Sequence, residues 1–176
     1  MAERTRRDLR FTLDDIEEAR HTDFLKLDTQ GSELLILENA VETLRHVSVI
    51  QTEVSFVPLY KNQAMFADVD RFLREQGFMF HTFLYFGGRA LQPLAVNNDP
   101  NAALRQILWS DAVYIKPFNL SLKGPKPVEL LKRAVLFHIL FRSYDFAARA
   151  IQDYDRLTGA SLTEAYVRSL GQQIAA

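Results

Sequence analysis

Two carboxylates lie where apolar segments of this chain end, and a lysine lies inside one of these segments. Asp28 follows the short run 24–27, which itself contains Lys26, and Glu53 lies near the end of the run 47–54. Both runs are rich in apolar or β-branched residues and predict buried strands. An unpaired charge inside such a strand costs several kcal/mol. The pattern therefore predicts a functional site, in which one carboxylate acts as a base while the other positions the reacting group.

Each of these groups also has a purely structural interpretation. Lys26 and Asp28 point to the same side of a strand, so they could form an ion pair with no catalytic role. Glu53 could accept hydrogen bonds from loop amides. Glu33, in the first turn of the next predicted helix, is favoured there by the helix dipole alone. The residue types do not choose between these interpretations.

The composition is that of an ordinary globular protein. Of the 176 residues 48% are hydrophobic and 24% charged, and the formal net charge is −1. Basic and acidic residues are interspersed, which argues against a nucleic-acid partner. Cysteine is absent, which excludes thiolate chemistry, and the histidines lack the spacing of a dedicated metal site. No apolar run reaches the about 20 residues of a membrane span, and no signal core follows the N-terminus, so we expect a cytoplasmic protein without membrane contact.

The order of predicted elements is typical of an open α/β sheet. They are a short helix at 14–20, a strand at 24–28, a helix at 33–40 with a kinked continuation to 46, a strand at 47–54, a helix at 66–76, and strands at 78–86 and 107–116. The last two strands have no helical crossover between them, which predicts an antiparallel last strand. The loop with Tyr60 and Lys61 should open over the carboxyl ends of the parallel strands, where such sheets bind ligands. Substrate contact and plain loop packing both fit these two residues.

A change of composition divides the chain. The stretch 122–127 reads Leu-Lys-Gly-Pro-Lys-Pro, and everything beyond it has helical periodicity. We therefore expect a sheet domain at 1–122 and a C-terminal helical extension at 123–176. The first two helices of this extension have the character of one helical-hairpin repeat unit.

Several short stretches between Thr12 and Tyr114 have the order and near spacing of one known family. They are Thr12-Leu13-Asp14-Asp15, the run from Asp23 to Glu33, Leu37 to Ala40, Glu53, Pro58-Leu59-Tyr60, Phe72-Leu73 with Gly77-Phe78, and Trp109 to Asp111. With these stretches the chain resembles the FkbM-type methyltransferases, a family of S-adenosylmethionine-dependent O-methyltransferases. Gln30 stands where that family usually has an acidic residue, and Thr29 where an aliphatic residue is common.

The resemblance implies a fold, a cofactor and a set of site residues. The fold is a Rossmann-like methyltransferase half-sheet, mostly parallel with the last strand antiparallel, followed by the helical extension. The cofactor is S-adenosylmethionine and the acceptor is a hydroxyl on a small metabolite or sugar. We expect Asp28, Glu53 and Lys26 to be catalytic, Asp28, Gln30 and Gly31 to contact the cofactor, and Glu33, Tyr60 and Lys61 to contact the acceptor.

One part of the family pattern is missing from this chain. Family members begin with a strand, a glycine-rich turn and a helix that hold the cofactor, but all seven glycines here lie at or after Gly31. The strand at 24–28 would then have an unpaired edge. We expect the C-terminal helices, a second copy in a homodimer or a partner chain to cover it. The alternative function is a catalytically inactive module that acts in protein–protein interaction, and the chain could also be a fragment of a longer protein.

Overall fold

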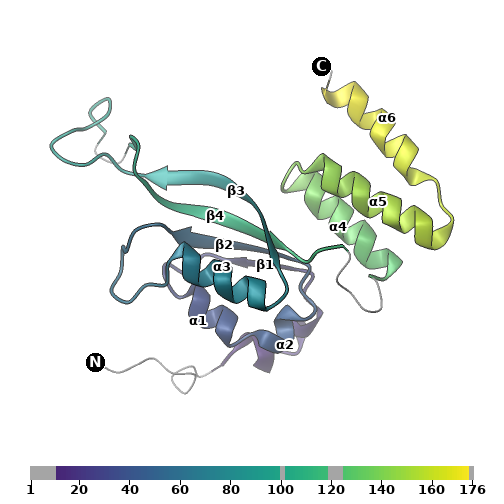
Figure 1. Ribbon diagram of the computed structural model, residues 1–176, viewed down its shortest axis with the longest axis horizontal. Coiled ribbons are helices and arrows are strands. Elements are labelled where there is room, and N and C mark those ends of the chain that lie inside the picture. Colours follow the sequence, from purple (N-terminus) through teal and green to yellow (C-terminus); the bar gives the residue numbers. More distant parts are fainter. Residues whose placement is uncertain (1–10, 100–101, 119–124, 175–176) are drawn as a thin grey trace. The chain divides into compact units, whose positions relative to one another are not determined.

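The computed structural model describes residues 11–99, 102–118 and 125–174, with side chains to 171. The chain divides into two compact units, Met1–Pro117 and Phe118–Ala176. The first contains the sheet and the second contains three helices (Figure 1). The predicted boundary after Leu122 lies outside the described residues.

A four-stranded sheet forms the centre of the first unit. Its strands are β1 (Phe24–Leu27), β2 (Val49–Ser55), β3 (Met79–Gly88) and β4 (Ile107–Ile115), in the order β1-β2-β4-β3. β1 and β2 pair in parallel, and β4 is antiparallel to both of its neighbours, so β1, β2 and β3 run in one direction. This confirms the predicted α/β fold with a mostly parallel sheet and an antiparallel last strand.

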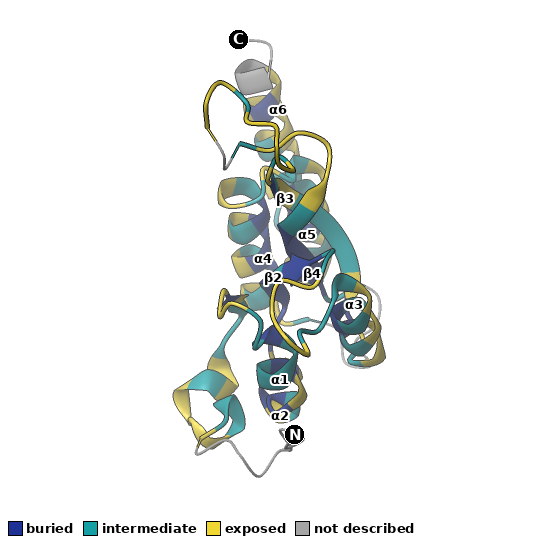
Figure 2. Ribbon diagram, turned by 90° about the vertical axis from the view of Figure 1, so that its left-hand side faces the viewer, coloured by how far each residue is buried: buried dark blue, intermediate teal, exposed yellow. Residues whose placement is uncertain are grey.

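Three helices cover one face of this sheet. They are α1 (Glu33–Glu38), α2 (Val41–Leu44) and α3 (Phe66–Glu75). Leu37 and Leu73 from the helices share a fully buried core with Ile50 and Tyr114 from the central strands. Buried positions are dark blue along β2 and β4 in Figure 2. Because side chains alternate along a strand, Glu53 lies on the opposite face of β2 from Ile50.

The predicted N-terminal helix at 14–20 is wrong. The chain forms two 3-10 turns instead, Leu13–Asp15 and Glu18–His21, with extended backbone at Ile16 between them. The 3-10 turns form in place of a helix because the Asp14 side chain bonds to residues far along the chain. The Asp14 carboxylate accepts the backbone N–H groups of Glu42 and Thr43 at 3.1 and 2.7 Å, and so satisfies the free amides at the start of α2.

The predicted continuation of the first long helix to residue 46 is a separate helix. The backbone leaves the helical region at Asn39 and Ala40, where ψ is 19° and 27°, and α2 begins at Val41. This break gives α2 an N-terminus of its own, which is the end that Asp14 caps.

The expectation that Lys26 and Asp28 lie within a buried strand is also wrong. Their side chains are 49% and 45% exposed. Among the described strands β1 lies at one edge of the sheet and pairs only with β2. Leu27 faces the core and is buried, whereas the charged side chains lie on the other side of the strand. The charges therefore carry no large burial cost.

The second unit consists of α4 (Pro127–Ile139), α5 (Tyr144–Thr158) and α6 (Leu162–Ile174). α4 and α5 form a hairpin joined by a short connection, and α6 packs on α5. Gly159 ends α5 in the left-handed conformation, with φ of 76°. Asp155 then accepts the amides of Leu162 and Thr163 at 3.0 and 2.8 Å, which fixes the start of α6. None of the helices in the described part of the chain is long and apolar enough to cross a membrane.

Candidate functional site

The turn after β1 is built around the carboxylate of Glu33. Its Oε1 accepts the backbone N–H of Thr29 at 2.7 Å and the Thr29 hydroxyl at 3.0 Å, and its Oε2 accepts the N–H of Gly31 at 2.9 Å. Gly31 has φ of 104°, a conformation that favours glycine. Glu33 is buried and all of these bonds stay within the turn. The contacts favour the structural interpretation of Glu33 over the predicted acceptor contact.

Replacing Glu33 with Ala is expected to lower the free energy of unfolding by about 2–3 kcal/mol, since hydrogen bonds to a charged group are lost and amides are left unpaired. Urea denaturation measures the change. Glu38→Ala is the matched control, because Glu38 is exposed at the end of the same helix. Equal losses in the two variants would show that the turn does not depend on the Glu33 carboxylate.

Asp28 lies at the carboxyl end of β1 between two neighbours. Lys26 Nζ is 3.7 Å from Asp28 Oδ2, and Gln30 Nε2 donates to Asp28 Oδ1 at 3.0 Å. An exposed ion pair at this distance is weak. The Gln30 hydrogen bond is therefore the main contact that positions Asp28, whose negative charge stays accessible.

Glu53 lies near the carboxyl end of the neighbouring strand β2. Burial raises the pKa of its carboxyl group, and the negative charges of Asp28, Glu33 and Asp111 raise that pKa further, while a hydrogen bond from Gln30 partly offsets them. The structure thus brings Asp28 and Glu53 into electrostatic contact across adjacent strand ends. A carboxylate with a raised pKa is a stronger proton acceptor than an ordinary glutamate.

The loop after β2 packs on the turn after β1. Gln63 Nε2 donates to Ser55 Oγ at 2.7 Å, and Gln63 Oε1 accepts the amide of Tyr60 at 3.1 Å. The Tyr60 hydroxyl donates to Gln30 Oε1 at 3.4 Å. A Cβ added to Gly31 would come within 3.2 Å of Tyr60 Cδ2, so the two segments approach closely. Lys61 is exposed beside Tyr60.

The sequence did not predict three residues of the site near Glu53. They are Asp111, Gln51 and Tyr85. Asp111 pairs opposite Glu53 between β2 and β4 and is 4% exposed. It accepts hydrogen bonds from Gln51 Nε2 at 2.5 Å and from the Tyr85 hydroxyl at 3.1 Å. Burial raises the pKa of Tyr85 to about 12, with the Asp111 charge adding to the effect, so this hydroxyl stays a donor. The signal that could have found Asp111 is a lone carboxylate in an apolar strand, the same signal that singled out Asp28.

The site is therefore a group of carboxylates at and beside the carboxyl ends of β1 and β2. Asp28, Glu53 and Asp111 provide negative charge, and Glu53 is the member whose pKa is raised. Such a group can accept a proton and can attract a cationic ligand. Within residues 11–99, 102–118 and 125–174, no three metal-ligating side chains are grouped closely enough to hold a metal ion.

Comparison with known families gives a match to part of the chain. Residues 8–80 match the model of the Methyltransferase FkbM domain, a segment that contains Asp28, Glu33, Glu53 and Tyr60. The match shows that this segment is similar to part of that methyltransferase domain. The matched family is FkbM, as the shared sequence stretches predicted.

One similar solved structure is described as a suspected DNA modification methylase from Thermus thermophilus. The sequence identity is 14% and the TM-score is 0.32, over 65% of this chain and 52% of that chain. This chain thus spans about half the length of that structure, and a similarity at this level says nothing about function. No curated protein matches the chain.

Proposed function

We propose that this chain forms the C-terminal half of the catalytic domain of a cytoplasmic, S-adenosylmethionine-dependent methyltransferase, and that it methylates a hydroxyl on a small metabolite or sugar. The observation that carries the proposal is the position of Asp28 and Glu53. They lie at the ends of neighbouring parallel strands, in electrostatic contact, within the segment that matches the methyltransferase domain.

The residues present fit part of S-adenosylmethionine. Its sulfonium is cationic, and Asp28, Glu53 and Asp111 supply negative charge at and beside the carboxyl ends of β1 and β2. Gln30 bonds to Asp28 and Tyr60 beside these carboxylates, and the backbone of Gly31 approaches Tyr60 so closely that a Cβ there would come within 3.2 Å of its ring. When bound, the cofactor would supply an electrophilic methyl group for transfer to the acceptor oxygen.

The chain's own residues then have distinct roles. Glu53 accepts the proton of the acceptor hydroxyl, for which its raised pKa suits it. Asp28 orients the acceptor, Gln30 holds Asp28 through a hydrogen bond, and Lys26 lies beside Asp28 as a weak ion-pair partner. Tyr60 covers the site from the loop after β2, with Lys61 beside it as an acceptor contact. Glu33 shapes the turn that presents Gln30.

The free edge of β1 is an argument for a partner chain that pairs with it. No described strand pairs with that edge, and an open strand edge is a template for another strand. A polypeptide that carries the glycine-rich half of the domain would complete both the sheet and the cofactor site. Size-exclusion chromatography with light scattering distinguishes this partner from a homodimer, because a homodimer forms from the purified chain alone.

Calorimetric titration with S-adenosylhomocysteine tests the proposal. The purified chain, or the assembly that completes its sheet, is expected to bind it with a dissociation constant on the order of micromolar. Gln30→Ala is expected to weaken binding, because its amide bonds to Asp28 in the turn. Glu42→Gln, an exposed change in an ion pair with Arg45 on α2, is the control and should bind unchanged.

If neither the chain nor any assembly it forms binds S-adenosylhomocysteine, the proposal that this chain is part of a methyltransferase is wrong. That result would favour the second candidate, an inactive module that acts in protein–protein interaction. The specific observation behind that candidate is the same open edge of β1, since a strand that recruits a partner does not require a cofactor.

A further inference from the structure

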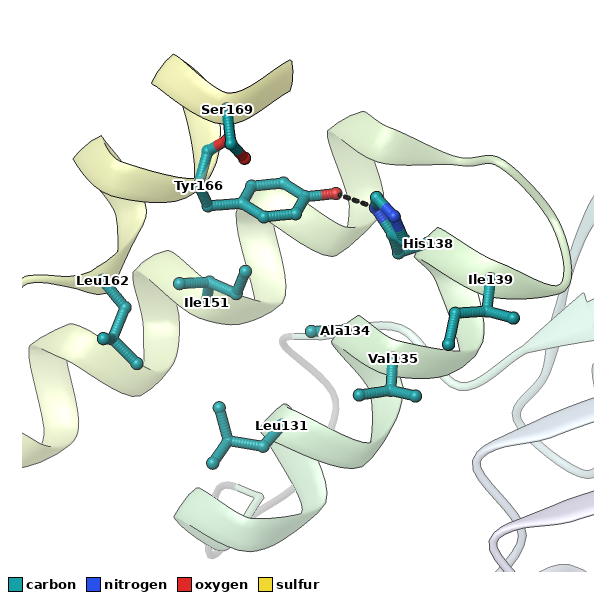
Figure 3. A pocket seen from close by; sticks show the side chains of 9 residues that line it. All are labelled: Leu131, Ala134, Val135, His138, Ile139, Ile151, Leu162, Tyr166 and Ser169. Carbon is teal, nitrogen blue, oxygen red and sulfur yellow. Dashed lines mark hydrogen bonds between the residues drawn. The ribbon is translucent and has the colours of Figure 1, made fainter. Parts of the chain in front are cut away.

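The helical unit contains a pocket that the methyl-transfer proposal does not use. Its volume is about 530 Å³, and it lies between α4 and α6 with α5 as its floor (Figure 3). Leu131, Val135 and Ile139 of α4 form one wall, Ile151 of α5 lies below, and Leu162 of α6 contributes to the other wall. Pockets for small molecules typically have volumes of about 300–1,000 Å³ and mainly apolar walls.

One polar pair lies within these apolar walls. His138 Nδ1 and the Tyr166 hydroxyl are 2.9 Å apart and join α4 to α6 (Figure 3). The His138 ring also packs against Tyr144, with 5.2 Å between the ring centroids. Burial raises the pKa of Tyr166, and the nearby Tyr144 adds to this, so the hydroxyl stays neutral. The pair is a fixed point at which a ligand can form a hydrogen bond.

The lining determines which chemistry the pocket accepts. It contains no Asp, Glu, Lys or Arg side chain, so an ionised ligand would lose its hydration without gaining a counter-charge. Val135 and Ile139 are 56% and 65% exposed, although both line the pocket. An apolar ligand would remove this surface from water, which favours binding.

We propose that this pocket binds an uncharged, mainly apolar small molecule with one hydrogen-bonding group, which bonds to the His138–Tyr166 pair. The ligand's apolar body lies against Leu131, Val135 and Ile151. This binding site is independent of methyl transfer, because every contact that defines it lies within the helical unit.

Titration of the full chain with 2-naphthol and with naphthalene tests the proposal. The two compounds share an apolar body, and only 2-naphthol has a hydroxyl. Both are expected to give saturable shifts in the amide NMR signals of the lining residues. Tyr166→Phe is expected to weaken 2-naphthol binding by about five- to tenfold, as for the loss of one hydrogen bond, and to leave naphthalene binding unchanged.

Two further variants test the location. Ser169→Phe adds a large side chain at an exposed position of the lining and should abolish binding of both compounds. Val167→Phe, exposed on the same helix but outside the lining, should bind both compounds as the unaltered chain does. Circular dichroism checks that each variant is folded.

Three results would overturn the proposal. They are the absence of saturable shifts at the lining amides, equal losses in the Ser169→Phe and Val167→Phe variants, and an equal effect of Tyr166→Phe on both compounds. Binding of a peptide at these amides without binding of either naphthalene compound would also overturn it, since the occupant would then be a polypeptide.

Discussion

Replacing Asp28 with Asn is expected to lower the methyl-transfer rate of the completed enzyme by about 100-fold, the cost of losing alignment of a reacting group. Asn has nearly the same shape and can still bond to Gln30, but it lacks the charge that orients the acceptor. The rate is measured as formation of S-adenosylhomocysteine. The affinity for S-adenosylhomocysteine, measured by calorimetry, should change much less than the rate.

Glu42→Gln is the control for this variant. Glu42 pairs with Arg45 on the surface of α2, so both rate and affinity should remain as they are in the unaltered enzyme. Unchanged turnover in the Asp28→Asn enzyme would remove Asp28 from the chemistry and leave it as the exposed partner of Lys26.

Replacing Glu53 with Gln is expected to lower the rate by about 10²–10⁴-fold, the range that a general base contributes. Glu53 acts in its deprotonated form, so kcat/KM should fall as the pH falls through its pKa. That pKa lies above the ordinary value of 4.5, because burial and neighbouring charges raise it. We call this fall of kcat/KM at low pH the acid limb. It should be absent from the residual activity of the Glu53→Gln enzyme.

Asp111→Asn gives the matching test of the electrostatics. It removes one of the negative charges that raise the pKa of Glu53, while Asn can still bond to Gln51 and Tyr85. The acid limb of kcat/KM should therefore move to lower pH. A limb that stays in place, or moves to higher pH, would show that Glu53 is not the group that titrates.

The sequence was sufficient to predict the strands that consist of β-branched or apolar runs. The β-branched run that became Val49–Ser55 and the apolar run that became Ile107–Ile115 each read as a strand without knowledge of their partners. Gly31 lies between a predicted strand and a predicted helix, where a turn is needed, and its φ of 104° is the conformation that glycine favours. The placement of Asp28 and Glu53 at neighbouring strand ends followed from the parallel order of these elements.

What escaped prediction depends on partners far along the chain. Asp14 looked like the start of its own helix, but it caps α2 through Thr43, a contact that no local pattern reveals. The role of Asp111 depends on the register that sets it opposite Glu53, which is known only once β4 is placed between β2 and β3. The exposure of Lys26 likewise depends on which strands pair with β1, and not on the residues of β1 themselves.

The position of β4 between β2 and β3 has a consequence for biosynthesis. Both neighbours precede β4 in the sequence, so each leaves the ribosome before the strand that will join them. Until Ile115 emerges, one edge of β2 is unpaired and β3 has no strand partner, because both pair with β4. Unpaired strand edges promote aggregation, so we expect the partly synthesised chain to be more prone to aggregation than the complete one.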